Sequence, residues 1–425
     1  MFSRALVAVA PRHSSKLLTA LSARRGLLQR YRQWAETNRD MDRPLVWLHA
    51  PSVGEGLQAL PVLERFRERH ADSQIVYTFF SPSAKQFAAK MGADFADYLP
   101  FDSSDAADPI LDALRPSALI FSKLDVWPFL VERASLRGTK LGLLSATMPQ
   151  SSGRMSRIAK AALTDAYGAL DAVGAIAPGD AQRLIEVGVR PERLIVTGDT
   201  RYDQVWSRAG ETSQARAQLL ERFRDPRPTL VAGSTWRSDE ERLLPAWVQV
   251  RRAMPAVRLI IAPHELSAKR LASIERWAAT ASLSVARTSD PAGAQADVVL
   301  VDQYGILGDL YAVGDAAYVG GGFRGAGLHS LLEPAAFGIP VIVGPRHLDN
   351  RDAALLVAGG GAARCTGVGD IATRIRIWFG NAEVLRKARS GARRVVESEL
   401  GAADRSVEIA ESLVYGTALS VMGRP

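Results

Sequence analysis

Two glutamates follow turns made of small residues, where a carboxylate can react or bind a ligand. Glu55 follows the apolar run 45–49 and the turn 50–54, and it begins an expected helix. The helix dipole stabilises an anion at that place, and an ionised carboxylate at a cleft edge can take a proton from an attacking hydroxyl. A first-turn glutamate that only complements the dipole is the alternative. The pattern therefore predicts a general base at Glu55, with that alternative left open.

The second glutamate, Glu333, follows a glycine-rich loop that is typical of a phosphate site. The loop comes after the apolar run 316–319 and contains Gly320, Gly321, Gly322, Gly325 and Gly327. Glycine permits positive φ angles and close approach of a ligand, and the helix after the loop directs N–H groups at it. A carboxylate at Glu333 can accept hydrogen bonds from both hydroxyls of a ribose. Alternatively, Ser330 and Glu333 form a capping box that serves only the helix.

Hydroxyl and imidazole side chains follow two other expected strands. Gly233-Ser234-Thr235 suits either a phosphate or a plain helix cap. His264 comes directly after the run 258–262 on the same side of the expected sheet, and His329 lies inside the glycine loop. Because His49, His264, His329 and His347 show no metal-ligand spacing, we expect no metal.

Several nucleotide and hydrolase motifs are absent from the sequence. Gly54-Glu-Gly56 lacks the third glycine and the distant acid of a dinucleotide fingerprint, which argues against a nicotinamide site. There is no Walker loop and no Gly-x-Ser-x-Gly elbow. We therefore expect no bound cofactor.

Short apolar runs alternate with helical patterns, which indicates parallel, doubly wound sheets. The expected strands are 45–49, 75–78, 98–100, 118–121, 141–144, 172–175 and 194–197, then 229–232, 258–262, 284–286, 298–301, 316–319 and 341–343. The charged segment 201–228 ends in Asp225-Pro-Arg-Pro228 and has the composition of a linker. We predict an α/β fold with two Rossmann-like domains, 41–210 and 226–400, facing across a cleft, and a C-terminal helix in 401–425.

The N-terminal segment 1–40 is basic and amphipathic. Its first 34 residues carry seven basic side chains and no acid. Leu27, Tyr31 and Trp34 are among its recurring apolar residues, yet no run is long enough to span a bilayer. We predict a helix lying on an anionic membrane surface. A solvated basic tail, or a helix packed on its own protein, remains the alternative.

Composition narrows the class of protein further. The chain has 425 residues, a net charge of +8 and one cysteine, Cys365, which we interpret as a structural thiol in a reducing compartment. The positive charge indicates acidic partners such as nucleic acid, anionic lipid or phosphorylated ligands. Because the sequence has no aromatic–basic platform and no recognition helix, nucleic acid is not expected.

Taken together, these motifs resemble the 3-deoxy-D-manno-oct-2-ulosonic acid (Kdo) transferases of Gram-negative bacteria, which have the GT-B glycosyltransferase architecture. Trp47-Leu-His-Ala-Pro-Ser-Val-Gly-Glu55 is similar to the family's Ser-Val-Gly-Glu turn, and Ala232-Gly-Ser-Thr-Trp-Arg-Ser-Asp-Glu240 resembles its Gly-Ser-Thr-Trp segment. The stretch 320–336 resembles its glycine loop and Leu-Glu-Pro-Ala-Ala helix. Several motifs in the right order, over about residues 31–394, make the resemblance specific.

The resemblance implies transfer of Kdo from CMP-Kdo to the glucosamine disaccharide of a phosphorylated lipid A precursor, at the cytoplasmic face of the inner membrane. It implies Glu55 as the base, with inversion at the anomeric carbon. Ser234, Thr235 and the loop 321–327 would hold the CMP phosphate, and Glu333 the ribose. The residues implied for donor binding are Ser234, Thr235, His264, Gly321, Gly322, Gly325, Gly327, His329, Ser330, Glu333 and Arg201. The resemblance also implies a catalytic role for Asp125 and acceptor binding by Ser52 and Lys123.

Departures from the family pattern fall mostly in the first half, and one in the second, where Gly327-Leu-His-Ser330 stands in place of the Gly-Gly-His-Asn of many members. Lys123-Leu-Asp-Val-Trp-Pro128 stands where the family often has Glu-Thr-Glu-Leu-Trp-Pro, so one acid is retained as Asp125 and the other is Lys123. Ser145-Ala-Thr-Met-Pro149 stands in place of Asn-Ala-Arg-Leu-Ser, so an arginine is lost. Two other hypotheses are an enzyme of the same fold that uses a UDP-sugar, and a non-catalytic relative. The intact Glu55, Ser234 and Glu333 argue against the second of these.

Overall fold

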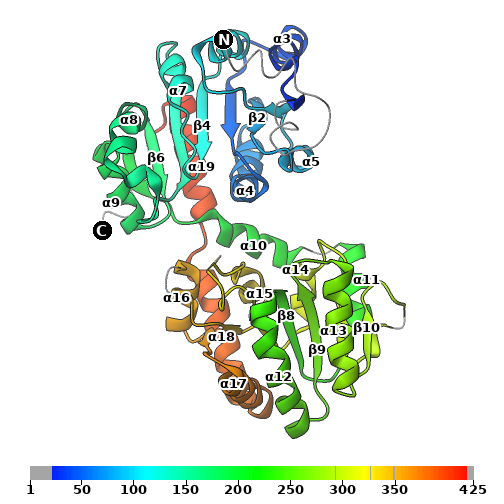
Figure 1. Ribbon diagram of the computed structural model, residues 1–425. Coiled ribbons are helices and arrows are strands. Elements are labelled where there is room, and N and C mark those ends of the chain that lie inside the picture. The colour runs from blue at the N-terminus through cyan, green and yellow to red at the C-terminus, as the bar shows by residue number, and fades with distance from the viewer. Residues whose placement is uncertain (1–21, 212, 292, 326, 348–349, 419–425) are drawn as a thin grey trace. The chain divides into compact units, whose positions relative to one another are not determined.

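The computed structural model describes residues 22–211, 213–291, 293–325, 327–347 and 350–418. The chain divides into two compact units (Figure 1). The first unit comprises Met1–Gln204 and Leu400–Pro425, and the second comprises Val205–Glu399. Each unit has its own parallel sheet and its own hydrophobic core.

The first unit is built on a seven-stranded parallel sheet in the order β3-β2-β1-β4-β5-β6-β7. Its strands are β1 (Leu45–His49), β2 (Gln74–Phe79), β3 (Phe95–Tyr98), β4 (Ala118–Ser122), β5 (Lys140–Ala146), β6 (Ala172–Ala175) and β7 (Leu194–Val196). Its helices are α3 (Leu27–Asn38), α4 (Val53–Arg69), α5 (Ala84–Ala88), α6 (Ser104–Leu114), α7 (Pro128–Ser135), α8 (Arg157–Gly168), α9 (Pro178–Glu186) and α19 (Ala402–Tyr415). The strand order reverses between β1 and β4, so the turns after these two strands open a crevice at the carboxyl edge.

The second unit repeats this design, with a seven-stranded parallel sheet in the order β10-β11-β9-β8-β12-β13-β14. Its strands are β8 (Thr229–Thr235), β9 (Arg258–Pro263), β10 (Val285–Arg287), β11 (Val298–Leu300), β12 (Ala316–Val319), β13 (Val341–Val343) and β14 (Ala362–Arg364). The helices are α11 (Gln214–Phe223), α12 (Arg237–Ala253), α13 (Ala268–Thr280), α14 (Leu307–Leu310), α15 (Leu332–Ala336), α16 (Arg351–Ala358), α17 (Val368–Gly380) and α18 (Ala382–Ser398). Here the order reverses between β8 and β12, and Val319 pairs with Gly233 at the end of both strands.

The fold class predicted from the sequence is confirmed, and the expected strands are present. One strand is shifted, because β3 covers Phe95–Tyr98 rather than 98–100. β14 has no counterpart in the sequence prediction, because Ala362–Arg364 is too short to stand out from its surroundings. The sheets position the two crevices that matter for function.

The linker prediction for 201–228 is wrong, because most of this segment is helical. α10 (Thr200–Gly210) starts in the first unit and ends in the second, and α11 follows it. The charged composition that indicated a linker is that of two solvent-facing helices. The boundary therefore lies at Gln204/Val205, inside α10, rather than between 210 and 226.

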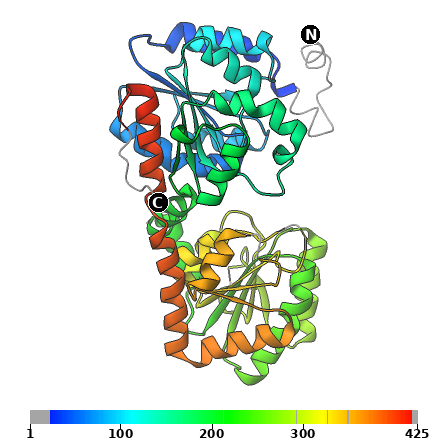
Figure 2. The ribbon, with the colours of Figure 1, turned by 90° about the vertical axis from the view of Figure 1, so that its left-hand side faces the viewer.

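The C-terminal helix α19 belongs to the first unit, where it packs against α4 and β5 (Figure 2). Glycines in two strands permit this approach. A Cβ atom on Gly142 would lie 2.6 Å from the Leu413 side chain, and one on Gly174 would lie 2.9 Å from the Ile409 side chain. The helix predicted in 401–425 is thus part of the core of the first unit. The pattern of apolar residues in this segment predicted a helix but did not indicate which unit it packs on.

The described part of the N-terminal segment packs on its own protein. Tyr31 is fully buried and donates to the Tyr98 carbonyl at 3.0 Å, Trp34 stacks on Phe95, and Leu27 is also buried. The apolar face that predicted membrane contact is therefore used inside the first unit over residues 22–38. Residues 1–21, which carry the rest of that prediction, lie outside the described residues. Among the helices that the structure describes, none is long and apolar enough to cross a membrane.

Arg24 anchors this segment to the edge of the sheet. Its guanidinium lies 4.2 Å from the Phe80 ring centre and 4.9 Å from that of Tyr98, and Nε donates to the Leu99 carbonyl at 2.8 Å. Burial lowers the pKa of Arg24 to about 10. A guanidinium between aromatic rings contributes attraction that is strongest when it is shielded from water.

We expect Arg24→Ala to lower the stability of the first unit by about 2–4 kcal/mol, because it removes both the ring contacts and the hydrogen bonds to carbonyls. Thermal unfolding followed by calorimetry measures this. Arg32→Ala is the matched control, since Arg32 is exposed on α3, the helix that directly follows Arg24. Equal melting temperatures for the two variants would show that the segment does not depend on Arg24.

Candidate active site

The predicted site residues fall into two groups, one in each unit. The first group contains Ser52, Glu55, Lys123 and Asp125, which follow β1 and β4 at the crevice of the first sheet. The second group contains residues that follow β8, β9 and β12 in the second unit: Ser234, Thr235, His264, Gly321, Gly322, Gly325, Gly327, His329, Ser330 and Glu333.

Glu55 lies in the first turn of α4, as the sequence predicts. Ser52 precedes the helix, and its hydroxyl donates to one carboxylate oxygen of Glu55. Lys123 Nζ lies 3.3 Å from the other oxygen, Oε1. The Glu55 side chain is 18% exposed and that of Lys123 39%, so the ion pair is reachable from solvent. The Glu55 carboxylate is thus held in one orientation as a hydrogen-bond acceptor. A glutamate that only complements the helix dipole does not need such neighbours.

The backbone explains how Lys123 reaches Glu55. Lys123 has a φ angle of +69°, in the left-handed region that residues with a side chain rarely adopt. Its N–H donates to the Leu144 carbonyl of the neighbouring strand at 2.8 Å, which holds the turn after β4 in this conformation. The lysine that replaces a family acid is therefore a fixed neighbour of Glu55.

Asp125 lies in the same turn and has two cationic or potentially cationic neighbours. Arg154 Nη2 lies 3.2 Å from Oδ1, and His49 Nε2 lies 3.9 Å from Oδ2. Burial by itself raises the pKa of Asp125, but His49, Arg154 and Trp127 together bring it below its usual value. Burial lowers the pKa of the fully enclosed His49, which keeps its ring neutral near pH 7. Asp125 is therefore an ionised carboxylate at physiological pH.

Arg201 belongs to a different unit from the other residues implied for donor binding. It belongs to the first unit, where its guanidinium forms two hydrogen bonds to Asp199 Oδ2, at 2.9 and 2.6 Å. Asp199 is fully buried and also accepts a hydrogen bond from Gln58. Arg201 therefore neutralises a buried carboxylate, which accounts for its charge without a ligand.

In the second unit, Asp239 joins the turn after β8 to the glycine loop after β12. Its carboxylate accepts hydrogen bonds from Trp236 N, Gly321 N and the Tyr318 hydroxyl, each at 3.0 Å. Asp239 is fully buried in the first turn of α12. The two loops predicted to bind phosphate are thereby held as one surface.

The glycines of the loop divide by role. A Cβ atom on Gly320 would lie 2.2 Å from the Ser234 carbonyl oxygen, and one on Gly322 would lie 2.5 Å from Gly344 N. These two residues let the loop lie against its neighbours, and Gly321 has a φ of +102°. Gly325 and Gly327 are exposed and border open space. The close packing belongs to the first three glycines, and the last two are accessible to a ligand.

Aromatic rings stack beside the loop. Trp236 and His264 have ring centres 4.1 Å apart, and His264 and His329 are 4.5 Å apart. Trp236 Nε1 donates to His329 Nε2 at 3.0 Å, so the proton of a neutral His329 lies on Nδ1. Burial lowers the pKa of His329, which favours this neutral form. The Arg324 guanidinium lies 3.6 Å from the Trp236 ring centre and adds a cation next to the stack.

Glu333 lies in the first turn of α15, but the capping box expected as the alternative is absent. The helix begins at Leu332 with Leu331 as N-cap, and no side chain caps it. Ser330 lies outside the helix and is exposed. Burial raises the pKa of Glu333, and nearby Arg208 opposes this effect. The carboxylate is available to accept hydrogen bonds from a ligand.

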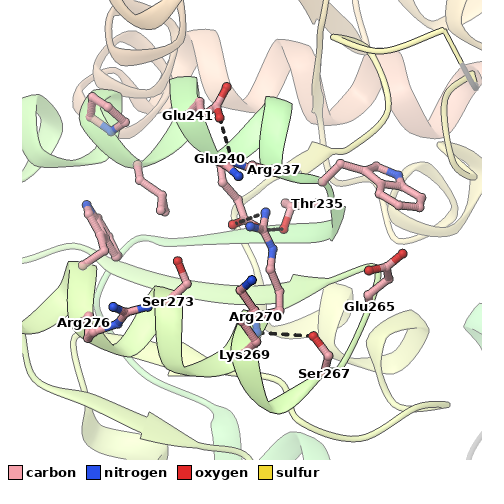
Figure 3. Close-up of a pocket in the computed structure, with 14 residues that line it drawn as sticks. Thr235, Arg237, Glu240, Glu241, Glu265, Ser267, Lys269, Arg270, Ser273 and Arg276 are labelled. Carbon is pink, nitrogen blue, oxygen red and sulfur yellow. Dashed lines mark hydrogen bonds and ion pairs between the residues drawn. The ribbon is translucent and has the colours of Figure 1, made fainter.

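Thr235 lies at the rim of a cavity of about 640 Å³ between α12 and α13 (Figure 3). The Thr235 hydroxyl is buried and donates to Glu240 Oε1 at 2.8 Å, and Glu240 Oε2 lies 2.5 Å from Arg270 Nη2. Burial raises the pKa of Glu240 to about 7 despite Arg270. Thr235 thus supports the turn through Glu240, while Ser234, with a φ of +52°, is the partly exposed hydroxyl.

Metal and thiol chemistry find little support in the described part of the chain. Among the residues that the structure describes, no group of three or more His, Cys, Asp and Glu side chains could hold a metal ion. Cys365 is buried, and burial raises its pKa to about 11. The thiol therefore behaves as a structural residue.

Two doubly wound parallel units, each with its polar residues at the reversal of strand order, define the GT-B class of fold. The UDP-GlcNAc 2-epimerase of Neisseria meningitidis, solved with UDP-GlcNAc, has a similar fold, with a TM-score of 0.65 at 13% identity over 88% of this chain and all of that one. At this identity the similarity shows the fold alone.

Sequence comparison assigns the family. Residues 20–204 match the family described as 3-deoxy-D-manno-octulosonic-acid transferase (kdotransferase). The 3-deoxy-D-manno-octulosonic acid transferase of Bordetella pertussis is 30% identical over 75% of each chain, and that of Chlamydophila psittaci is 29% identical over 76% of this chain and 74% of its own. The chain belongs to the 3-deoxy-D-manno-octulosonic acid transferase family.

Three residues of the two sites escaped the sequence analysis. Asp239 was identifiable as a first-turn carboxylate three residues after Trp236, a spacing that favours a bond to the N-cap N–H. Arg154 and His49 had no such signal, because their neighbour Asp125 is distant in the sequence and only the sheet brings them together.

The raised pKa of Glu240 predicts how stability depends on pH. A folded-state pKa near 7 exceeds the usual 4.5, so the folded protein holds this proton over a range where the unfolded chain has lost it. The contribution is complete below about pH 4.5 and is lost as pH rises through 7, a change on the order of 3 kcal/mol. The melting temperature of the parent protein should therefore fall between pH 5 and 8. In Glu240→Gln this fall should be absent.

The exposed neighbour Glu241 provides the control for this prediction. It pairs with exposed Arg237 at 3.0 Å, so Glu241→Gln should keep the pH dependence of the parent protein. If the parent and Glu240→Gln melt with the same pH dependence, Glu240 titrates at its ordinary value.

Proposed function

We propose that this protein transfers Kdo from CMP-Kdo to a phosphorylated glucosamine disaccharide of a lipid A precursor, with inversion at the anomeric carbon. The observation that carries the proposal is the retained Ser-Val-Gly-Glu turn, in a chain that belongs to this family. That turn holds the Glu55 carboxylate between Ser52 and Lys123 at the crevice of the first sheet. No resident cofactor takes part in this proposal.

The second unit is the proposed donor site. The joined loops present Ser234 and the backbone N–H groups near Gly325 and Gly327 to a phosphate, which helix N-termini and glycine loops bind well. The unpaired carboxylate of Glu333 suits the two ribose hydroxyls. His264 and Arg324 lie close enough to the loop to meet the phosphate or the sugar carboxylate.

The proposed chemistry needs one proton transfer and one displacement. Glu55 takes the proton from the acceptor hydroxyl as its oxygen attacks the anomeric carbon of Kdo. The bond from that carbon to the phosphate oxygen breaks, and CMP leaves with the bonding electrons. The Lys123 side chain stabilises the negative charge near the reacting oxygen.

A lipid acceptor agrees with the surface of the first unit. Phe129 is 51% exposed on α7 and Ile158 is 86% exposed on α8, and these two helices pack together. Arg157 and Lys160 flank Ile158 on the same helix. Exposed apolar side chains among cations are typical of proteins that contact an anionic lipid surface. We place the enzyme at the cytoplasmic face of the inner membrane, with the segment 1–21 as a second contact.

The fold similarity to enzymes that bind UDP-sugars keeps one alternative, a GT-B enzyme with a UDP-sugar donor. The glycine loop and the ribose carboxylate serve either nucleotide equally well. The family relationship favours the cytidine nucleotide.

Glu55→Gln should reduce Kdo transfer by about 10²–10⁴-fold, because the amide cannot accept the proton while its shape is retained. The measurement is turnover with CMP-Kdo and a tetra-acylated, bis-phosphorylated glucosamine disaccharide. Glu68→Gln, an exposed position on the same helix, is the matched control and should keep the parent rate. Unchanged turnover in Glu55→Gln would eliminate Glu55 as the base.

A further inference from the structure

Two buried hydrogen-bond donors near Asp125 have no partner in the described structure. They are Nε2 of His49 and Nε1 of Trp127. Buried N–H groups are almost always paired, so two orphans around one carboxylate require an explanation. The rings of His49 and Trp127 meet edge to face with centres 6.0 Å apart, so both belong to one cluster.

The groups on the two sides of the His49 ring favour a proton on Nε2. The Thr78 hydroxyl accepts from Trp47 Nε1 at 2.9 Å and lies 3.0 Å from His49 Nδ1. The hydroxyl still has its own hydrogen, which it can donate to Nδ1. On the other side, the ionised Asp125 carboxylate faces Nε2 and favours the tautomer that carries its proton there, although Oδ2 lies 3.9 Å away, beyond hydrogen-bond distance.

Asp125 is instead held on the other side by Arg154, at 3.2 Å from Oδ1. Both side chains of this pair are about one third exposed, at 30% and 32%, whereas His49 is fully buried. The carboxylate therefore stands between an outer cation and two inner N–H donors. A small rotation of the Asp125 side chain would move its carboxylate from Arg154 to the N–H groups of His49 and Trp127.

We propose that Arg154 binds the phosphate group of the acceptor, and that Asp125 turns inward to His49 and Trp127 when it does. The inference rests on the proposed function, which supplies a phosphorylated acceptor at this unit. An arginine matches a phosphate with two parallel hydrogen bonds, which Lys123, already paired with Glu55, does not offer. In the free protein the Asp125 carboxylate thus occupies the place at Arg154 that the phosphate takes in the complex. His49 is a positioning residue, because it binds the carboxylate after it turns inward.

The proposal makes an unusual prediction about Asp125. Because the carboxylate competes with the ligand for Arg154, Asp125→Asn should tighten binding of glucosamine 1-phosphate, by about fivefold or more. Arg154→Gln should weaken it about tenfold or more. Arg190→Gln, which changes an exposed arginine of the same unit, is the control and should bind like the parent. Calorimetry on the full chain, with glucosamine as the phosphate-free probe, measures each affinity.

The inner position is tested separately by nitrogen NMR of the histidine rings. Adding glucosamine 1-phosphate should shift the Nε2–H signal of His49 as it gains a hydrogen bond, and this shift should be absent in Asp125→Asn. His49→Leu should weaken binding of the ligand, whereas His49→Gln, which keeps a donor near that place, should retain most of it.

The outcomes separate this proposal from the proposed function. Weaker or unchanged binding in Asp125→Asn, or no phosphate-dependent binding by the parent protein, would overturn the exchange at Arg154. Failure of Kdo transfer alongside the predicted binding pattern would overturn the function and leave the phosphate subsite standing. Normal transfer with unaltered affinity in Arg154→Gln would overturn the subsite alone.

Discussion

The second unit depends on one buried carboxylate, that of Asp239. It accepts hydrogen bonds from two chain segments that are 85 residues apart in the sequence, at Trp236 N and Gly321 N. The sheet brings the ends of β8 and β12 side by side, but it does not determine the course of the loops beyond them. Asp239 supplies that constraint, and burial together with this carboxylate raises the pKa of its third partner, Tyr318. The two loops of the proposed donor site are thereby held in place.

The first unit reaches a comparable site by a different route. Its crevice also lies where the strand order reverses, but it is held by charged side chains in pairs, Glu55 with Lys123 and Asp125 with Arg154. Backbone groups that are already paired cannot change partner, whereas surface ion pairs exchange at little cost. The proposed nucleotide site is thus held by a buried carboxylate, and the proposed acceptor site by exchangeable ion pairs.

The sequence predicted the sheets, both crevices and the family, for physical reasons. Parallel strands buried on both faces appear as continuous apolar runs, and the loops at their carboxyl ends are rich in glycine and hydroxyl residues. The boundary was mislocated because α10 and α11 carry the charge pattern of a linker. The N-terminal helix was assigned to a membrane because a helix that packs on its own sheet edge has the same amphipathic pattern. Arg154 and His49 act through contacts between distant segments, which one sequence does not reveal, and the bond from Gly321 to Asp239 is of the same kind.

The central claim is that the second unit holds a cytidine nucleotide, with the ribose on Glu333. Calorimetric titration with CMP and with UMP tests it most directly, on the parent protein, Glu333→Ala and the exposed control Glu241→Ala. The account predicts that CMP binds the parent and the control more tightly than UMP does, and that Glu333→Ala loses about tenfold or more in affinity for CMP. Tighter binding of UMP, or unchanged binding of CMP by Glu333→Ala, would contradict it.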